Sequence, residues 1–169
     1  MEWFESDPLA KGMYFPYNSM SALRFRPQEL TLIAGPSFSG KSALLTSAMC
    51  YWMRDKKYSD KKEKFLLISP EFSPRMNLAR IIQQICARMP GDISAANVIA
   101  ACTWLEGRML IYDSVGSQEI DDIVNLIHLG VQEHGVTAVI LDNLTCLQLP
   151  SGPDRLSGET DLIVKLVES

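Results

Sequence analysis

No apolar run in this sequence of 169 residues approaches the roughly 20 consecutive residues that are needed to span a bilayer. The opening stretch, MEWFESDPLA, carries acidic side chains where a secretory signal carries basic ones, and it includes no apolar core. We therefore expect an intracellular protein without a membrane partner.

The sequence also lacks any C-x-x-C pair. Its cysteines lie far apart and within apolar segments, at Cys50, Cys86, Cys102 and Cys146. Zinc sites place their cysteine ligands at short spacings, so this pattern argues against such a site. We expect free, buried thiols in a reducing compartment.

Positive charge is not in excess either. The net charge is −4, so no global basic field attracts nucleic acid. Basic residues do concentrate between Arg54 and Lys64, where RDKKYSDKKEK carries six basic and three acidic side chains. We interpret this stretch as a solvated loop after a helix, with an anion-binding patch as the alternative.

The composition is that of an ordinary globular protein, with 47% apolar and 21% charged residues. There is no repeat and no obvious linker, so we expect a single domain over 1–169, with 1–28 as a lead-in segment. Apolar runs alternate with helical patterns, which predicts an α/β fold: a mostly parallel sheet with helices on both faces. The expected strands are 30–34, 65–69, 109–112 and 137–141, and the expected helices are 41–54, 74–89, 95–105, 118–134 and 161–168.

The stretch Gly35–Ser42, GPSFSGKS, matches the phosphate-binding pattern G-x-x-x-x-G-K-[ST] at every fixed position. Glycines let consecutive backbone N–H groups face a phosphate, and the following helix adds its positive N-terminal dipole. Lys41 would reach the β- and γ-phosphates, and the Ser42 hydroxyl would bind Mg²⁺. We predict that ATP with Mg²⁺ is bound by Gly35, Pro36, Ser37, Phe38, Ser39, Gly40, Lys41, Ser42 and Ala43.

Such a loop needs an acidic residue that holds the metal. Asp142 follows the apolar run TAVIL, at the strand end where ligands gather in parallel sheets. Asp113 follows another predicted strand and is the competing candidate. Asp142 is preferred because its strand is longer and more cleanly flanked.

Hydrolysis also needs a group that orients or deprotonates water. The residue directly after Asp142 is Asn143, which cannot act as a base. Glu71 lies just past the second predicted strand, and it would point toward the γ-phosphate if that strand lay beside the one before the phosphate loop. The competing interpretation of Glu71 is a surface residue or a helix-capping charge.

Three stretches together resemble the RecA-like ATPases, and among them the DnaB-like replicative helicases of phage, primase–helicase and Twinkle type. They are FRPQELTLIAGPSFSGKSALL, FLLISPEFSPRMNLARI and GVTAVILDNLTCL. The similarity extends from about Gly12 to Leu149, although Pro70 and Phe72 flank the glutamate where the family usually has S-L-E-M.

The resemblance implies an ATP-driven motor on single-stranded DNA, usually a hexameric ring with nucleotide sites between subunits. Lys41 and Glu71 take the family's catalytic positions, and Ser42 and Asp142 take its metal positions. The loop from Leu147 to Gly158 corresponds to a region that faces the ring channel, so Arg155 is a candidate DNA contact; the alternative is an exposed turn arginine.

The family's arginine finger and sensor residues would lie beyond Ser169, so we expect a core that is incomplete at its C-terminus. We expect the protein in the cytoplasm of a bacterium or a phage-infected host cell. Two other functions remain open: a RecA- or KaiC-like ATPase with a recombination or regulatory role, and a nucleotide-binding remnant without catalysis.

Overall fold

A computed structural model describes residues 12–20, 22–55, 63–87, 90–148 and 164. Its main sheet has three parallel strands in the order β4–β3–β5, and a short antiparallel pair, β1–β2, forms a second sheet. The strands are β1 (Met13–Tyr14), β2 (Arg24–Phe25), β3 (Phe65–Ile68), β4 (Met109–Ile111) and β5 (Ala138–Leu141). The helices are η3 (Asn18–Met20), α1 (Lys41–Arg54), α3 (Pro74–Cys86), η4 (Pro90–Asp92), α4 (Ala95–Leu105), α5 (Ile120–His134) and η5 (Leu144–Cys146).

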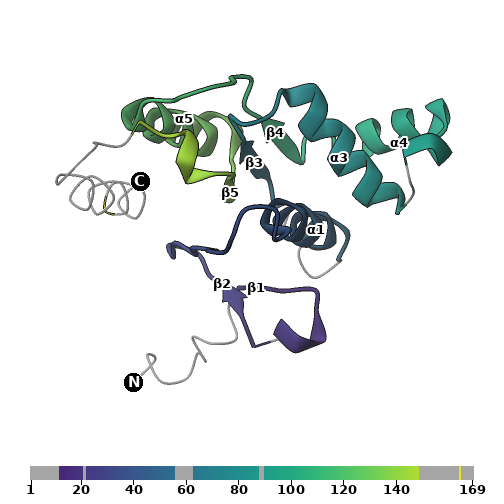
Figure 1. Cartoon of the computed structure of the whole chain (residues 1–169), viewed down its shortest axis with the longest axis horizontal. Coiled ribbons are helices and arrows are strands. Elements are labelled where there is room, and N and C mark those ends of the chain that lie inside the picture. The colour runs from purple at the N-terminus through teal and green to yellow at the C-terminus, as the bar shows by residue number, and fades with distance from the viewer. Residues whose placement is uncertain (1–11, 21, 56–62, 88–89, 149–163, 165–169) are drawn as a thin grey trace.

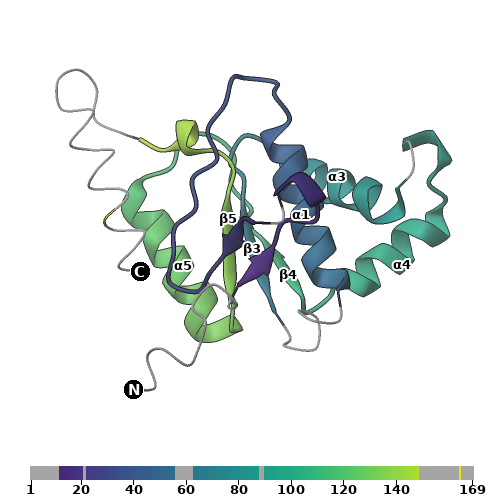
Figure 2. The same ribbon diagram turned by 90° about the horizontal axis from the view of Figure 1, so that it is seen from below.

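Strand β3 is the centre of the main sheet, and all four of its residues are buried. Its register pairs Phe65 with both Met109 and Ala138, and the bonding with β5 continues to the pair of Ile68 and Leu141. Because the three strands are parallel, their carboxyl ends meet at one edge of the sheet, where the loops after β3 and β5 lie close together (Figure 2).

Helices cover both faces of this sheet, as the alternating sequence pattern predicts (Figure 1). Phe65 and Leu67 point to one face and pack in a cluster with residues of α1, α3 and α4. Leu66 and Ile68 point to the other face and pack against α5. This alternation is the two-residue period of a strand, and here both faces are apolar because both are covered.

The helix boundaries follow local signals in the sequence. Ser73 accepts a hydrogen bond from the backbone N–H of Met76, and the next residue is a proline at the first helical position of α3. Helix α5 ends at Gly135, which has the left-handed φ of 65° that glycine tolerates. It begins two residues later than expected, because the backbone of Gln118 bonds with the segment after β5 instead.

The predicted buried strand at 30–34 is wrong. The segment is extended but belongs to neither sheet, and Leu30 and Leu32 are 46% and 64% exposed. Apolar content indicates that a segment can be buried, but a strand also needs a hydrogen-bonded neighbour. Among the described residues β5 pairs with β3 alone, so this segment has no such neighbour.

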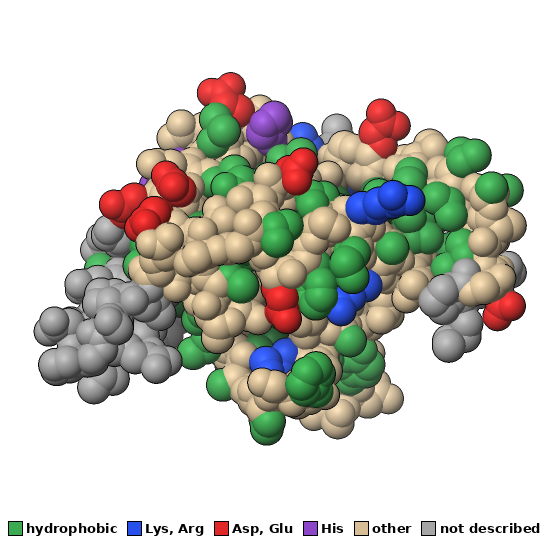
Figure 3. Space-filling view, turned by 45° about the horizontal axis from the view of Figure 1, so that its top comes forward, with side chains coloured by type: hydrophobic (Ala, Val, Ile, Leu, Met, Phe, Trp, Pro, Cys, Tyr) green, Lys and Arg blue, Asp and Glu red, His purple; other side chains and the backbone are tan. Residues whose placement is uncertain are grey.

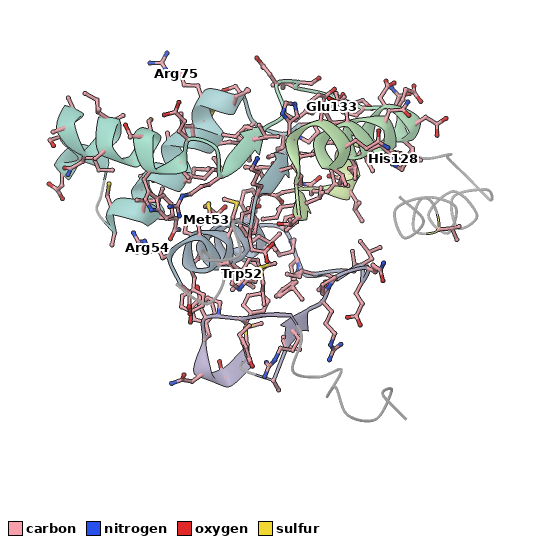
Figure 4. All side chains as sticks on the ribbon, turned by 180° about the vertical axis from the view of Figure 1, so that it is seen from behind. Trp52, Met53, Arg54, Arg75, His128 and Glu133 are labelled. Carbon is pink, nitrogen blue, oxygen red and sulfur yellow. The ribbon has the colours of Figure 1, made fainter. Side chains whose placement is uncertain are left out.

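The β1–β2 pair packs on α1 through aromatic side chains. Phe15 and Phe25 lie with their ring centroids 4.9 Å apart, and Phe25 is 4.8 Å from Trp52 of α1. Trp52 also stacks on Phe65 of β3 and is only 3% exposed. Figure 4 labels Trp52 in the interior and Arg75 projecting outward from α3. The N-terminal segment is therefore fixed against the helix that follows the phosphate loop.

The cysteines are all free, but only Cys50 is buried, while Cys86, Cys102 and Cys146 are half-buried. In the part of the chain that is described, no helix is long and apolar enough to cross a membrane. The predicted helix at 161–168 lies outside the described residues except for Val164, which is helical.

Candidate functional site

The phosphate loop forms a turn that leads directly into α1. Gly40 has φ of 89°, a left-handed conformation that favours glycine, and the backbone N–H of Leu44 bonds to its carbonyl at 2.8 Å. Phe38 is also left-handed, and its side chain is fully exposed at the tip of the loop. The sequence pattern thus places its glycine where the backbone needs one.

The Lys41 ammonium lies inside the loop. Its Nζ donates to the backbone carbonyls of Gly35 and Pro36 at 2.8 and 2.7 Å. A Cβ on Gly35 would meet the Ser39 hydroxyl at 3.2 Å, so a larger residue there would crowd the turn. The loop therefore holds the positive charge of Lys41 next to the backbone N–H groups that could receive a phosphate.

Ser42 and Asp142 lie in contact although 100 positions separate them. The Ser42 hydroxyl donates to Oδ1 of Asp142 at 3.0 Å, and both side chains are half-buried. Asp142 follows β5, and its own N–H bonds to the carbonyl of Ile68 in β3. Asp113 is exposed and follows β4, on the opposite side of β3.

A hydroxyl and a carboxylate oxygen are donors that Mg²⁺ prefers, together with water and phosphate oxygens. The Ser42–Asp142 pair therefore fits a magnesium ion that is held partly by the nucleotide. Among the described residues no group of three or more His, Cys, Asp or Glu side chains could hold a metal by itself.

Glu71 lies at the same sheet edge and is held by Asn143. The Asn143 Nδ2 donates to Oε2 of Glu71 at 2.9 Å. The side-chain Oδ1 of Asn143 in turn accepts from the backbone N–H of Thr145 at 3.0 Å and from the Thr145 hydroxyl. These contacts orient the amide so that its N–H faces the carboxylate.

The turn that carries Glu71 is also fixed from α3. The buried Asn77 donates through Nδ2 to the backbone carbonyls of Ser69 and Phe72, at 3.4 and 3.1 Å. Both asparagines were missed as site residues by sequence reasoning. Asn143 could have been noticed because it comes directly after the predicted metal-holding residue; no comparable signal marks Asn77.

The route by which Glu71 reaches the site differs from the expected one. The expected orientation of Glu71 was conditional on its strand lying beside the segment before the phosphate loop, and this condition is not met, because β3 has β4 on one edge and β5 on the other. Glu71 instead meets the site through β5, since Ile68 and Leu141 are paired and the residues just beyond them converge.

Negative charge gathers around Cys146 in the loop after β5. Burial raises the pKa of the Cys146 thiol, and the carboxylates of Glu71 and Asp142 raise it further, against hydrogen bonds with Thr145 and Asn143 that lower it. Both carboxylates therefore act on the same loop, and negative charge of this kind favours a nearby cation. The sheet edge thus offers both positive and negative groups to a metal–phosphate ligand.

A buried glutamine ties the loops behind this edge together. Gln118 donates through Nε2 to the Ser114 hydroxyl at 2.9 Å, and its Oε1 accepts from the Tyr112 hydroxyl. Its backbone bonds to Cys146 and Gln148, while Gly116 bonds to Pro70. The segments after β3, β4 and β5 are therefore connected by hydrogen bonds. Arg155, the candidate DNA contact, lies outside the described residues.

Residues 20–161 match the family model described as AAA domain. No curated protein matches the sequence. Among solved structures, a DnaB-like replicative helicase, studied with its interactions with primase, matches 99% of this chain with a TM-score of 0.73 and 17% identity. The match covers 42% of that helicase chain. The α/β RecA-like fold with a phosphate loop is therefore shared with it.

Proposed function

This chain belongs to the AAA domain family, and we propose that it binds ATP with Mg²⁺ and hydrolyses it as the motor core of a DnaB-like replicative helicase on single-stranded DNA. The observation that carries the proposal is the contact of Ser42 with Asp142, next to Glu71, at the carboxyl edge of a parallel sheet. Ligands of open α/β sheets bind at this edge.

Each side chain has a chemical task in this proposal. The backbone N–H groups of Gly35–Ser42 and the Lys41 ammonium hold the phosphates, and Ser42 with Asp142 holds Mg²⁺, which would neutralise charge that develops on the phosphates. Glu71 accepts a proton from water, or orients that water, for attack on the γ-phosphorus. Asn143 keeps the Glu71 carboxylate at a fixed place through its 2.9 Å hydrogen bond.

We further propose that the working form is a ring, with hexamer as the expected size and phage or bacterial DNA replication as the setting. The chain spans 42% of the helicase that it resembles, so groups from the rest of such a protein, including an arginine finger from a neighbouring subunit, would complete the site. The protein would then act in the cytoplasm of a bacterium or of an infected host cell, where this DNA is replicated.

We propose, from the sequence resemblance, that the segment 147–158 contacts DNA through Arg155, which lies outside the described residues. On the face in Figure 3, the basic side chains of the described residues lie scattered among acidic and hydrophobic ones. This face therefore offers no broad basic patch for a duplex, whereas a ring channel needs only a few cations that follow one strand.

Nucleotide binding is tested by titration calorimetry with Lys41→Ala. We expect loss of ATP binding, because the phosphates lose their fixed positive charge. Lys64→Ala is a matched control: its ammonium also donates to a backbone carbonyl, that of His134, but at the opposite end of β3. Unchanged ATP affinity in Lys41→Ala contradicts the proposed site.

The motor function is tested by ATP turnover with and without single-stranded DNA, on this chain and on a version extended past Ser169. Turnover that DNA stimulates in the extended version supports the motor. Strand exchange without unwinding supports a recombinase, and ATP binding without turnover, even with DNA, supports a nucleotide-binding remnant.

A further inference from the structure

An open cleft of about 500 Å³ adjoins the phosphate loop, a volume within the roughly 300–1,000 Å³ of small-molecule sites. Ser39, Gly40 and Lys41 form one end of it. Its other lining residues include Ser47 of α1, Tyr17, which lies just before η3, and Gln84 of α3. Sequence patterns marked no pocket here.

We propose that this cleft takes the base and ribose of the nucleotide, with Tyr17 stacking on the base and Gln84 bonding to its edge. The inference rests on the proposed function, which places the phosphates on Gly35–Ser42. Because Ser39, Gly40 and Lys41 line both the phosphate loop and the cleft, a ligand bound through its phosphates has its remaining part directed along the same surface.

Tyr17 is built as a stacking surface. Its hydroxyl donates to the Ser47 hydroxyl of α1 at 2.9 Å, and its ring centroid lies 6.3 Å from that of the buried Phe15. The ring is 39% exposed, so it is held in place while keeping surface for a ligand. When a base stacks on an aromatic ring that is already fixed, little binding free energy is spent on ordering the side chain.

Gln84 supplies a further polar group to the lining of the cleft. It is exposed on α3, and its side-chain amide offers one donor and one acceptor side by side. Adenine presents the complementary acceptor and donor at N7 and N6, whereas guanine presents two acceptors at that edge. The cleft therefore favours ATP over GTP.

The test compares the affinities of ATP and inorganic tripolyphosphate by calorimetry. In Tyr17→Ala we expect ATP to bind about 5- to 150-fold more weakly, the range of base–aromatic stacking, while tripolyphosphate binds as in the wild type. Tyr17→Phe keeps the ring and should retain most of the ATP affinity. Tyr51→Ala is the matched control, since Tyr51 is 38% exposed on α1 and does not line the cleft.

The outcomes separate this inference from the proposed function. A wild type that binds neither ligand overturns both. Tripolyphosphate binding together with an unchanged ATP affinity in Tyr17→Ala overturns the cleft assignment and leaves the phosphate loop standing. In Gln84→Ala the preference for ATP over GTP should fall several-fold; an unchanged ratio removes Gln84 from the assignment. Retained tripolyphosphate binding shows that a variant is folded.

Discussion

The side-chain amide of Asn143 donates a hydrogen bond to the Glu71 carboxylate, with 2.9 Å between Nδ2 and Oε2. The two residues are separated by 72 positions, and they meet because β3 and β5 are parallel neighbours. Asn143 cannot itself act as a base, but its hydrogen bond holds Glu71, the residue that we propose as the base.

Glu71→Gln should leave ATP binding intact and lower turnover by about 10²- to 10⁴-fold, the usual contribution of a general base. The amide retains the shape of the carboxylate but cannot accept a proton from water. Phosphate release, measured with and without single-stranded DNA, gives the turnover, and Glu106→Gln at the end of α4 is the control. Near-normal turnover in Glu71→Gln removes the proposed role.

Asn143→Ala should lower kcat by about tenfold or more, because a hydrogen bond to a charged group contributes about 1.5–3 kcal/mol. The affinity for ATP should stay within a factor of two to three, since Asn143 positions Glu71 and does not itself hold the phosphates. Asn143→Asp should be worse, as it sets a second carboxylate against Glu71. A loss that appears equally in ATP affinity points to a general structural defect instead.

Asp142→Asn should reduce the gain in ATP affinity on adding Mg²⁺ by about 10- to 100-fold, the range seen for groups that support a metal ion. Asp113→Asn should leave that gain unchanged, because Asp113 is exposed beyond the opposite strand. Calorimetry in Mg²⁺ and in EDTA gives the comparison. The reverse result assigns the metal to Asp113.

Gln118→Leu should destabilise the fold by about 1–3 kcal/mol, because it leaves the half-buried hydroxyls of Tyr112 and Ser114 without their hydrogen-bond partner. Gln132→Leu, on the exposed side of α5, is the control and should change little. Denaturant unfolding with circular dichroism measures both. Equal unfolding free energies of the two variants would mean that the hydrogen bonds of Gln118 contribute nothing to the stability of the fold.

Burial raises the pKa of Cys50 to about 11, against a weaker lowering by Arg54. When folding raises the pKa of a thiol, its contribution to the free energy of unfolding is fully present below the pKa of the unfolded state. That contribution is lost as the pH rises through the pKa of the folded state. Between about pH 8 and 11 the wild type should therefore lose stability relative to Cys50→Ala, by about 2–3 kcal/mol at 1.4 kcal/mol per unit.

Unfolding free energies of both proteins across this pH range provide the measurement. Because tyrosines and lysines also titrate there, only the difference between the two proteins is informative. A difference that stays constant with pH shows that Cys50 ionises in the folded state as easily as in the unfolded one.

Local signals in the sequence predicted much of the fold. Gly40 in its left-handed turn, Ser73 with Pro74 at the start of α3, and Gly135 after α5 all act over a few residues, so a pattern can reveal them. The segment 30–34 failed for the opposite reason. Its apolar residues are suited to a strand, but the neighbour that would pair with it is a property of the whole sheet.

The candidate site divides along the same line. The residues of the phosphate loop are contiguous in sequence, so a sequence pattern can identify them. Asp142 and Glu71 were predicted because they follow the ends of predicted strands. Two hydrogen bonds of the site join residues that are distant in sequence. The packing of β5 beside β3 brings Asn143 to Glu71, and the packing of the β1–β2 segment on α1 brings Tyr17 to Ser47.

Strand β3 has a hydrogen-bonded strand on each edge and a layer of helices on each face, whereas the segment 30–34 pairs with no strand of the described residues. Backbone amides in β3 should therefore exchange with solvent only when the whole domain unfolds, and those before the phosphate loop should exchange through small local openings. Glu71 follows the strand that we expect to exchange last, whereas the phosphate loop follows the segment that we expect to exchange early. The two parts of the proposed site would therefore open to solvent at different rates, and a bound triphosphate would connect them.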